Sequence, residues 1–233
     1  MLEVRNLHAH YGRAHILDGV SLAVGAGEVG VLLGRNGAGK TTTLKSIMRL
    51  LRSSRGEIVF AGRSITALQP FQISRLGLGY VPEDRRIFKE LSVAENLEVA
   101  RQPPRKGAPT WTAERIFKLF PNLAERYRNS AKVLSGGEQQ MLTIARTLMG
   151  NPRAILLDEP SEGLAPVIVE QTARAIQELK AQGVTVLLSE QNLYFSAIVA
   201  DRAFIIEKGT IHYAGSMKDA LNNATIRTTY LMV

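Results

Sequence analysis

The sequence predicts an α/β fold with a mainly parallel central sheet, an antiparallel β-subdomain towards the N-terminus and an inserted helical subdomain. First, short apolar runs without helical period alternate with helical segments along most of the 233 residues. Second, several candidate strands near the two ends of the chain suit antiparallel pairing. Third, between residues 82 and 151 the pattern changes to helices alone.

The individual elements follow from this patterning in chain order. Strands are expected at 2–7, 19–24, 29–33, 57–60, 78–81, 154–158, 184–189, 202–207 and 210–214. Helices are expected at 41–51, 93–101, 113–120 and 138–149, and the loop PPRKGAP separates two of them at 103–109. We therefore expect a single domain. Its core and β-subdomain comprise residues 1–82 and 151–233, and its helical subdomain comprises residues 83–150.

Composition sets outer limits on function. With 45% hydrophobic residues the chain can bury a full core, yet no apolar stretch approaches the roughly 20 residues of a membrane span. The N-terminus MLEVRNLHAH lacks the apolar centre of a secretory signal, so we expect a protein of the cytosol. Because the chain has no cysteine, it can form no disulfide or thiolate metal site, and we expect oxygen ligands for any metal.

The net charge of +8 and a pI of about 9.9 suit a polyanionic partner, either nucleic acid or an anionic membrane surface. The basic residues are scattered, and their densest group, Arg85, Arg86 and Lys89, is too short for a nucleic-acid-binding arm. A solvated basic face is the interpretation that the scatter favours.

A glycine-rich run has the G-x-x-x-x-G-K-T spacing of a phosphate-binding loop. Glycine lets consecutive backbone N–H groups turn inward around a triphosphate. Because the run links an apolar strand to a helix, the helix N-terminus and Lys40 would face the phosphates, and Thr41 would bind Mg²⁺. The alternative, a glycine turn beside an exposed lysine, explains less of this context. The pattern predicts a P-loop NTPase core whose nucleotide contacts are Gly34, Arg35, Asn36, Gly37, Ala38, Gly39, Lys40, Thr41 and Thr42.

Two adjacent carboxylates, Asp158 and Glu159, follow the apolar run AILL at the end of a predicted strand. Strand ends meet ligands in α/β sheets, and successive strand residues point in opposite directions, so the two carboxylates can have separate duties. We assign Asp158 to the Mg²⁺ shell and Glu159 to orienting and polarising the attacking water. Taken alone, an acidic pair that caps the following loop is an equally good interpretation.

A second helix N-terminus with open backbone donors is expected at Ser135, Gly136 and Gly137, in the segment LSGGEQQ. The apolar residues that follow recur with the helical period of 3.6 residues. In isolation this is an ordinary N-cap before a core helix. Beside a phosphate-binding loop, it gives the chain a second place for phosphate oxygens.

The order GRNGAGKT, LSGGEQQ and ILLDEP resembles the ATP-binding-cassette (ABC) family over essentially the whole chain. The resemblance implies two cassettes that face head to tail, with ATP and Mg²⁺ between the glycine loop of one chain and the LSGGE signature of the other. It also implies that Tyr11 stacks on adenine, with a packing tyrosine as the alternative. Hydrolysis then opens the pair and moves whatever is attached to it.

Three departures from most cassettes occur together. Glu83 stands where most have glutamine, Ala165 where most have aspartate, and Gln191 in the switch segment where most have histidine. In these three departures the sequence resembles the second ATP-binding subunit of branched-chain amino-acid importers. Glu83 can still bind Mg²⁺, and Gln191 can hydrogen-bond the γ-phosphate or the attacking water but cannot accept a proton as imidazole does. Glu159 is therefore expected to carry most of the base role, with Gln191 assisting.

The resemblance implies an ATP-hydrolysing motor at the cytoplasmic face of the inner membrane. Its expected partners are membrane permease subunits, a second ABC ATPase or another copy of itself, and, indirectly, a periplasmic solute-binding protein. Branched-chain amino acids are the expected cargo, with urea, short amides or aromatic carboxylates as the alternative. A nucleic-acid-associated ATPase is disfavoured because the sequence lacks a second cassette, a long coiled coil and cysteine zinc sites.

The segment EDRRIFKEL, residues 83–91, resembles the part of the cassette that meets a short cytoplasmic helix of the membrane subunit. Phe88 is the expected apolar anchor, and the neighbouring Arg85, Arg86 and Lys89 would face acidic partners or lipid headgroups. A core phenylalanine is the alternative.

Overall fold

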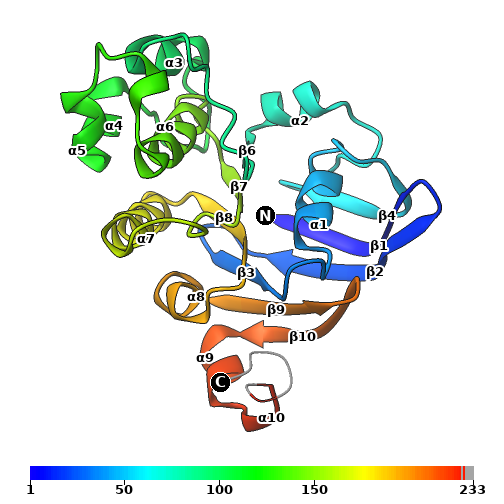
Figure 1. Ribbon diagram of the computed structural model, residues 1–233. Coiled ribbons are helices and arrows are strands. Elements are labelled where there is room, and N and C mark those ends of the chain that lie inside the picture. The colour runs from blue at the N-terminus through cyan, green and yellow to red at the C-terminus, as the bar shows by residue number, and fades with distance from the viewer. Residues whose placement is uncertain (227, 229–233) are drawn as a thin grey trace.

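The computed structural model describes residues 1–226 and 228 and contains two β-sheets with helices packed around them (Figure 1). The larger sheet has the strand order β10-β9-β3-β8-β7-β6, in which only β10 pairs antiparallel. Its strands are β3 (Val29–Leu33), β6 (Leu78–Val81), β7 (Ala154–Asp158), β8 (Thr185–Glu190), β9 (Arg202–Glu207) and β10 (Thr210–Ser216). The predicted mainly parallel sheet is confirmed.

The smaller sheet is antiparallel, with the order β2-β1-β4-β5. It consists of β1 (Leu2–Tyr11), β2 (Ala14–Val24), β4 (Ser53–Phe60) and β5 (Arg63–Ser64). β1 extends past its predicted end because buried Leu7 and Ala9 alternate with the partly exposed His8 and His10, which is the period of a strand. The antiparallel part of the fold is present and is longer than predicted.

The helices include all the predicted ones, with shifted ends, and several others. They are α1 (Lys40–Ile47), α2 (Pro70–Leu76), α3 (Val93–Val99), α4 (Ala113–Leu119), α5 (Pro121–Glu125), α6 (Gly136–Leu148), α7 (Pro166–Ala181), α8 (Leu193–Val199), α9 (Met217–Asn222) and α10 (Ala224–Ile226), with a 3₁₀ turn η1 (Ala131–Val133). The sequence prediction omits α7, whose first turn holds the β-branched Val167, Ile168 and Val169. Packing of its buried residues, Ile176 among them, outweighs this low propensity.

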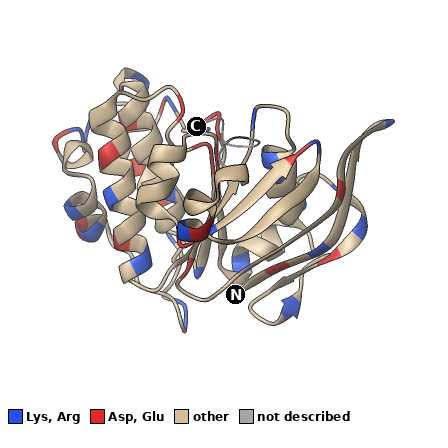
Figure 2. Cartoon of the chain, turned by 90° about the horizontal axis from the view of Figure 1, so that it is seen from below, with Lys and Arg blue, Asp and Glu red and all other residues tan. Residues whose placement is uncertain are grey.

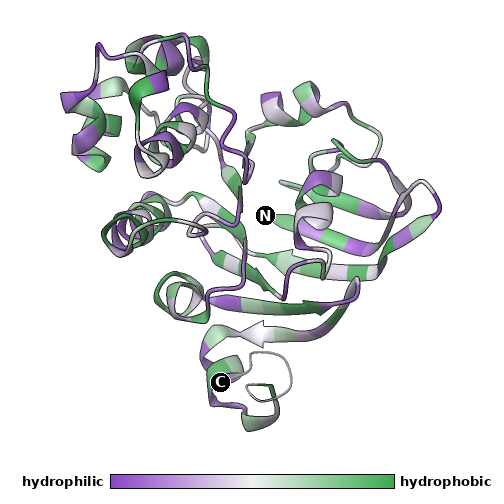
Figure 3. Ribbon diagram, viewed as in Figure 1, coloured by the Kyte–Doolittle hydropathy of each residue, from purple (hydrophilic) through white to green (hydrophobic). Residues whose placement is uncertain are grey.

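Two hydrophobic cores lie on opposite faces of the larger sheet. Val31 and Leu33 of β3 belong to the core shared with α3 to α8, whereas Leu32 belongs to the core shared with β1, β2, β4 and α1. Figure 3 shows the corresponding hydrophobic stretches along the strands and on the helices. Because the helices α3 to α6 share a core with the sheet, the division into residues 1–82 with 151–233 and residues 83–150 stays a prediction.

Charge and hydropathy agree with the expectations from composition. Lys and Arg are spread over many elements, with Asp and Glu between them, and form no single stripe in the view of Figure 2. Across the described residues, no helix has both the length and the apolar character needed to cross a membrane.

Candidate functional site

The loop between β3 and α1 has the backbone shape of an anion cradle. Gly37 and Gly39 have positive φ angles of 80° and 111°, which side chains rarely adopt. A Cβ atom on Gly34 would overlap the carbonyl oxygen of Ile206 in β9. The loop leads directly into α1, so the first-turn N–H groups of this helix point towards the cradle.

Lys40, the first residue of α1, folds back over this loop. Its side chain is only 3% exposed, and its Nζ donates to the carbonyl oxygens of Gly34 at 2.8 Å and Arg35 at 3.1 Å. Its counter-charge is the carboxylate of Glu159, 3.0 Å away. Because a buried ammonium needs a partner, Glu159 holds the position that a bound phosphate would take over.

Asp158, at the end of β7, is fully buried and receives three hydroxyl groups. Its Oδ1 accepts from Thr41 at 2.9 Å and from Ser189 at 2.7 Å, and its Oδ2 accepts from Tyr80 at 3.0 Å. Burial, followed by the charge of Asp158, raises the pKa of Tyr80, which keeps that phenol a donor. The Thr41 hydroxyl and the Asp158 carboxylate are adjacent hard oxygen donors, and they fit Mg²⁺.

Glu159 leaves the strand in a left-handed conformation, with φ 46°. Its N–H lies 3.0 Å from Ser189 Oγ and 3.2 Å from Ser189 O, which fixes this turn. The carboxylate therefore sits between Lys40 and Gln191, whose Nε2 is 3.5 Å from Glu159 Oε2. A non-glycine residue in this conformation is strained, and such strain concentrates where a side chain has to be aimed.

Glu162, three residues further on, adds a second carboxyl group next to Glu159. A hydrogen bond to Glu159, then burial, then the charges of Glu159 and Glu83 raise the pKa of Glu162 to about 7. The carboxyl group thus changes its charge near neutral pH, beside the proposed general base.

Glu190, at the end of β8, is 1% exposed and links two loops of the site. Its carboxylate accepts the N–H of Ser161 at 3.0 Å, of Gln191 at 3.2 Å and of Asn192 at 3.2 Å. Burial raises the pKa of Glu190, and these hydrogen bonds oppose the rise. The loop after Glu159 and the switch segment are therefore held by one side chain.

A cavity of about 230 Å³ opens beside the glycine loop. It is lined by Tyr11, Ile16, Gly37, Gly39, Lys40, Thr41, Thr42 and Glu159. Tyr11 is 49% exposed, so it is not the packing tyrosine of the alternative interpretation, and its ring is free for stacking. Arg35 and Asn36 are exposed at the loop tip, and buried Ala38 anchors the loop through a hydrogen bond from Gly209 N to its carbonyl oxygen.

Ser135, Gly136 and Gly137 form the N-terminus of α6, as predicted, but they do not line this cavity. Ser135 is the N-cap: its Oγ accepts from Glu138 N at 3.3 Å, and Glu138 Oε2 accepts from Ser135 N at 2.8 Å. Ser135 is exposed, whereas a Cβ on Gly136 would lie 2.7 Å from Arg85 Nη1. The signature is thus built as a helix start with crowded glycines, apart from the Lys40 loop of the same chain.

Glu83 also lies outside the cavity of Lys40. It lines a separate hollow of about 240 Å³ with Asp84, Arg85, Arg86, Ile87, Lys89 and Gln139. Its place in the Mg²⁺ shell, beside Thr41 and Asp158, therefore stays a prediction.

Phe88 is 49% exposed, with the guanidinium of Arg146 4.8 Å from its ring centre, so it is not the core phenylalanine of the alternative interpretation.

The sequence reasoning missed four residues of this site: Tyr80, Ser189, Glu190 and Glu162. Three of them share a usable signal, because each is a polar residue near the carboxyl end of an otherwise apolar strand, where ligands meet α/β sheets. Glu162 has no such signal, since its proximity to Glu159 arises from the turn after β7.

The buried Lys40 ammonium lies over a glycine loop and pairs with a neighbouring carboxylate. This arrangement suits the binding and hydrolysis of a nucleoside triphosphate, because the ammonium can exchange the carboxylate for a phosphate. The chain is therefore a P-loop NTPase, with the α/β fold of that class. A scan against known families then narrows the class, because the ABC transporter family matches residues 17–162.

Full-length relatives agree with this match. The high-affinity branched-chain amino acid transport ATP-binding protein BraG of Pseudomonas aeruginosa is 40% identical over 231 residues, 99% of each chain. The lipopolysaccharide export system ATP-binding protein LptB of Acidithiobacillus ferridurans is 38% identical over 99% of this chain and 96% of its own. This protein belongs to the ABC transporter family.

Solved structures support the same conclusion. The ADP conformation of an ATP-binding cassette of an ABC transporter superposes with a TM-score of 0.82 and 30% identity, covering 98% of this chain and 97% of that one. An ATP-binding subunit of an ABC transporter gives a TM-score of 0.83 at 28% identity, covering 100% and 96%. The protein is a Mg²⁺-dependent ATPase of an ABC transporter.

Proposed function

We propose that this ATPase drives a branched-chain amino-acid importer from the cytoplasmic face of the inner membrane. The observation that carries the proposal is the full-length similarity to BraG, at 40% identity over 99% of both chains. The three departures at Glu83, Ala165 and Gln191 support it, because together they resemble this branch of the family.

A second candidate cargo is lipopolysaccharide, exported rather than imported. The similarity to LptB of Acidithiobacillus ferridurans, at 38% identity, and to LptB of Escherichia coli, at 34%, favours this candidate almost as strongly. The cavities of the ATPase do not separate the two, since transported molecules do not reach a motor subunit.

Complementation separates the two cargoes. The gene is expressed in a Pseudomonas aeruginosa strain lacking BraG, and uptake of labelled leucine is measured; in parallel, it is expressed in an Escherichia coli strain depleted of LptB, and growth is measured. The proposal expects leucine uptake and no rescue of growth, with a Glu159→Gln variant as the inactive control in both strains. Rescue of growth without leucine uptake would transfer the function to lipopolysaccharide export.

We also propose how the site hydrolyses ATP. In a head-to-tail dimer, the γ-phosphate lies between Lys40 of one subunit and the N-terminus of α6 of the other, where Ser135, Gly136 and Gly137 offer donors. Thr41 and Asp158 would hold Mg²⁺, which would supply positive charge to offset the charge that develops on the phosphates. Glu159, released from Lys40 by the phosphate, orients and polarises the attacking water, and Gln191 supports it through a hydrogen bond.

The permease subunits are proposed to dock on a hollow of about 480 Å³ near the segment 83–91. Its lining includes Phe71 of α2, Tyr80 of β6 and Arg146 of α6. Arg146 also donates to Arg86 O at 2.5 Å and lies over Phe88, so it joins the hollow to the predicted docking segment. Tyr80 joins the same hollow to Asp158, which gives a docked helix a short mechanical route to the nucleotide site.

A cross-linking experiment tests this docking surface. Cysteine introduced at Phe88 is expected to cross-link to a cysteine in the short cytoplasmic helix of the permease in the active complex. Because the chain has no native cysteine, the background is clean. A cysteine at the exposed Val133, in η1, is the matched control, and cross-linking there but not at Phe88 would contradict the assignment.

A further inference from the structure

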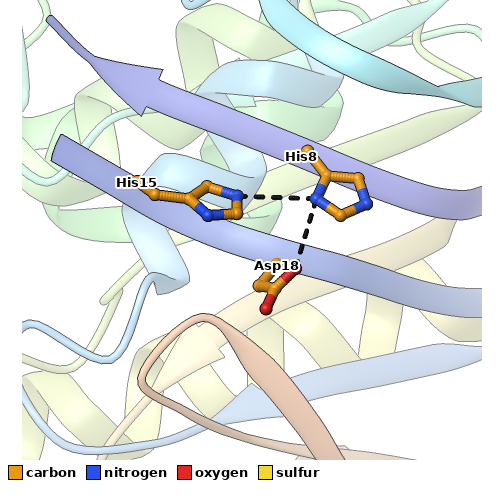
Figure 4. A group of neighbouring side chains, drawn as sticks. All are labelled: His8, His15 and Asp18. Atoms are coloured by element: carbon orange, nitrogen blue, oxygen red, sulfur yellow. Dashed lines mark hydrogen bonds and ion pairs between the residues drawn. The ribbon is translucent and has the colours of Figure 1, made fainter. Parts of the chain in front are cut away.

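Three polar side chains converge on the solvent face of the β1–β2 hairpin, far along the chain from the catalytic carboxylates. Figure 4 shows His8 on β1 and His15 and Asp18 on β2 pointing towards one another. His8 Nδ1 lies 3.4 Å from His15 Nε2 and 3.3 Å from Asp18 Oδ1. The three ligand atoms all lie within 4.8 Å of one another.

These spacings match the edges of a small coordination polyhedron. With bonds of about 2.0–2.1 Å to imidazole nitrogen or carboxylate oxygen, two ligand atoms at a tetrahedral angle are about 3.3–3.4 Å apart. The two separations measured from His8 Nδ1, 3.4 Å and 3.3 Å, have this length. Two imidazoles and a carboxylate suit a borderline transition-metal ion better than Mg²⁺ or Ca²⁺.

The strand register explains how Asp18 reaches the histidines. Leu7 pairs with Val20 and Ala9 pairs with Leu17, so two residues of β2 face the single residue His8 of β1. This is a β-bulge, and it turns Asp18 onto the face that His8 occupies. Gly19, the other bulge residue, has φ 71°. A Cβ there would lie 3.2 Å from Asn6 Oδ1, so glycine suits this position.

Two neighbours orient the imidazole rings. His8 Nε2 is 3.1 Å from Asn6 Oδ1, so in the metal-bound form Nε2 would donate to this oxygen and leave the Nδ1 lone pair for the ion. A second interaction of this kind is usual for metal-binding histidines. His10 stacks on His15 with ring centres 4.2 Å apart, which fixes the plane of the His15 ring.

We propose that His8, His15 and Asp18 bind one divalent transition-metal ion of the Zn²⁺ type. Asp18 and His15 are exposed and His8 is partly exposed, so an ion can enter from solvent and a water can complete the coordination. Such a site would add imidazole nitrogens to the oxygen ligands that the lack of cysteine leads us to expect.

The position of the site gives the ion a mechanical role. His10 pairs with His15 and Tyr11 pairs with Ala14, so the ion links β1 to β2 in the part of the hairpin that ends at Tyr11. Such a link limits motion of the exposed tyrosine. Its effect on adenine stacking rests on the proposed role of Tyr11, whereas metal binding itself does not.

The test is isothermal titration of the full, tag-free chain with Zn²⁺, without nucleotide and with Mg²⁺ in excess to occupy the oxygen site at Asp158. One Zn²⁺ per chain is expected, and Co²⁺ should give the strong visible absorption of tetrahedral coordination. Hydrogen exchange of the β1–β2 hairpin should slow when Zn²⁺ is added.

The variants identify the ligands. His8→Ala and, separately, the exposed Asp18→Asn should abolish the binding event, and Asn6→Gly, which suits the φ of 49° at this position, should weaken it by about 10- to 100-fold. His10→Phe keeps the stacked ring and should bind as the wild type does. The proposal would be overturned if the wild-type chain bound no Zn²⁺, or if His8→Ala and Asp18→Asn bound Zn²⁺ as tightly as the wild type does. The cluster would then be only a histidine–aspartate ion pair. Neither result would bear on ATP hydrolysis.

Discussion

The glycine loop with its carboxylates and the signature at α6 differ in how far each is complete within one chain. Lys40, Asp158 and Glu159 are buried, and each has polar partners in the same chain. At Ser135 the helix start is exposed, and a capping box holds it in shape. The first region is organised before ligand binds, and the second presents donors outward, as the proposed shared site requires.

The largest expected effect is in the organised region. Glu159→Gln removes the proposed general base and should lower ATP turnover by a factor on the order of 10²–10⁴. ATP binding should persist, because the amide no longer competes with phosphate for Lys40. Steady-state hydrolysis by the assembled transporter and nucleotide titration measure the two effects. Glu170→Gln, on the exposed face of α7, is the control and should behave as wild type.

The second prediction tests whether the signature serves a partner subunit. Ser135→Ala should lower turnover by about tenfold or more, since it removes a donor to a charged phosphate. Ser92 is a matched control, because it caps α3 with the same box: Glu95 N donates to Ser92 Oγ at 3.2 Å, and Ser92 N donates to Glu95 Oε2 at 2.7 Å.

Both alanine variants should lose about 1 kcal/mol of stability, measured by thermal or denaturant unfolding. Only Ser135→Ala should lose activity and ATP-dependent dimers, which analytical ultracentrifugation detects. If the two variants lost activity equally, Ser135 would be an ordinary helix cap. The helix start at Ser135 would then not differ from the Lys40 region by serving a partner subunit.

A smaller effect is expected from Gln191, at the edge of the organised region. Gln191→Ala removes one neutral hydrogen-bond donor, 3.5 Å from Glu159, and should lower turnover by about two- to tenfold. Gln191→His restores a donor and should recover most of the activity. A loss in Gln191→Ala that exceeds the loss in Glu159→Gln would reverse the roles assigned to these two residues.

The same contrast explains what could be predicted from the sequence. The chemistry of Lys40, Asp158 and Glu159 follows from local spacing, because strand, glycine loop and helix determine one another over a few residues. The helix start at Ser135 is equally local. The hydroxyl groups of Tyr80 and Ser189 reach Asp158 only because β6, β7 and β8 are neighbours in the sheet, and strand order is not a local property.

The β1–β2 hairpin shows another limit. The strand predicted at 2–7 ends before His8, although Leu7 and Ala9 alternate with His8 and His10, and nothing in this pattern indicates the bulge that brings Asp18 to the same face. That irregularity depends on the pairing of two strands, and the only local hint is Gly19. Exposure of Phe88, which makes it available to a partner, also depends on how the segment 83–91 packs on α6, where Thr143 Oγ1 donates to Arg85 O.

The smallest expected effect concerns pH. The pKa of Glu162 is raised from 4.5 to about 7, first through its hydrogen bond to Glu159. The folded chain therefore binds this proton more tightly than the unfolded chain does, and the stability that the proton contributes is lost as pH rises through about 7.

Above that pH a second negative charge stands beside Glu159 and opposes the incoming triphosphate. The KM for MgATP should accordingly rise by a few-fold between about pH 6 and pH 8. The rise is small because solvent and salt screen the repulsion between the exposed Glu162 carboxylate and the triphosphate. Glu162→Gln should flatten this profile without changing the low-pH KM. If the KM of Glu162→Gln still rose with pH in this range, the titrating group would be another residue near Lys40, Asp158 and Glu159.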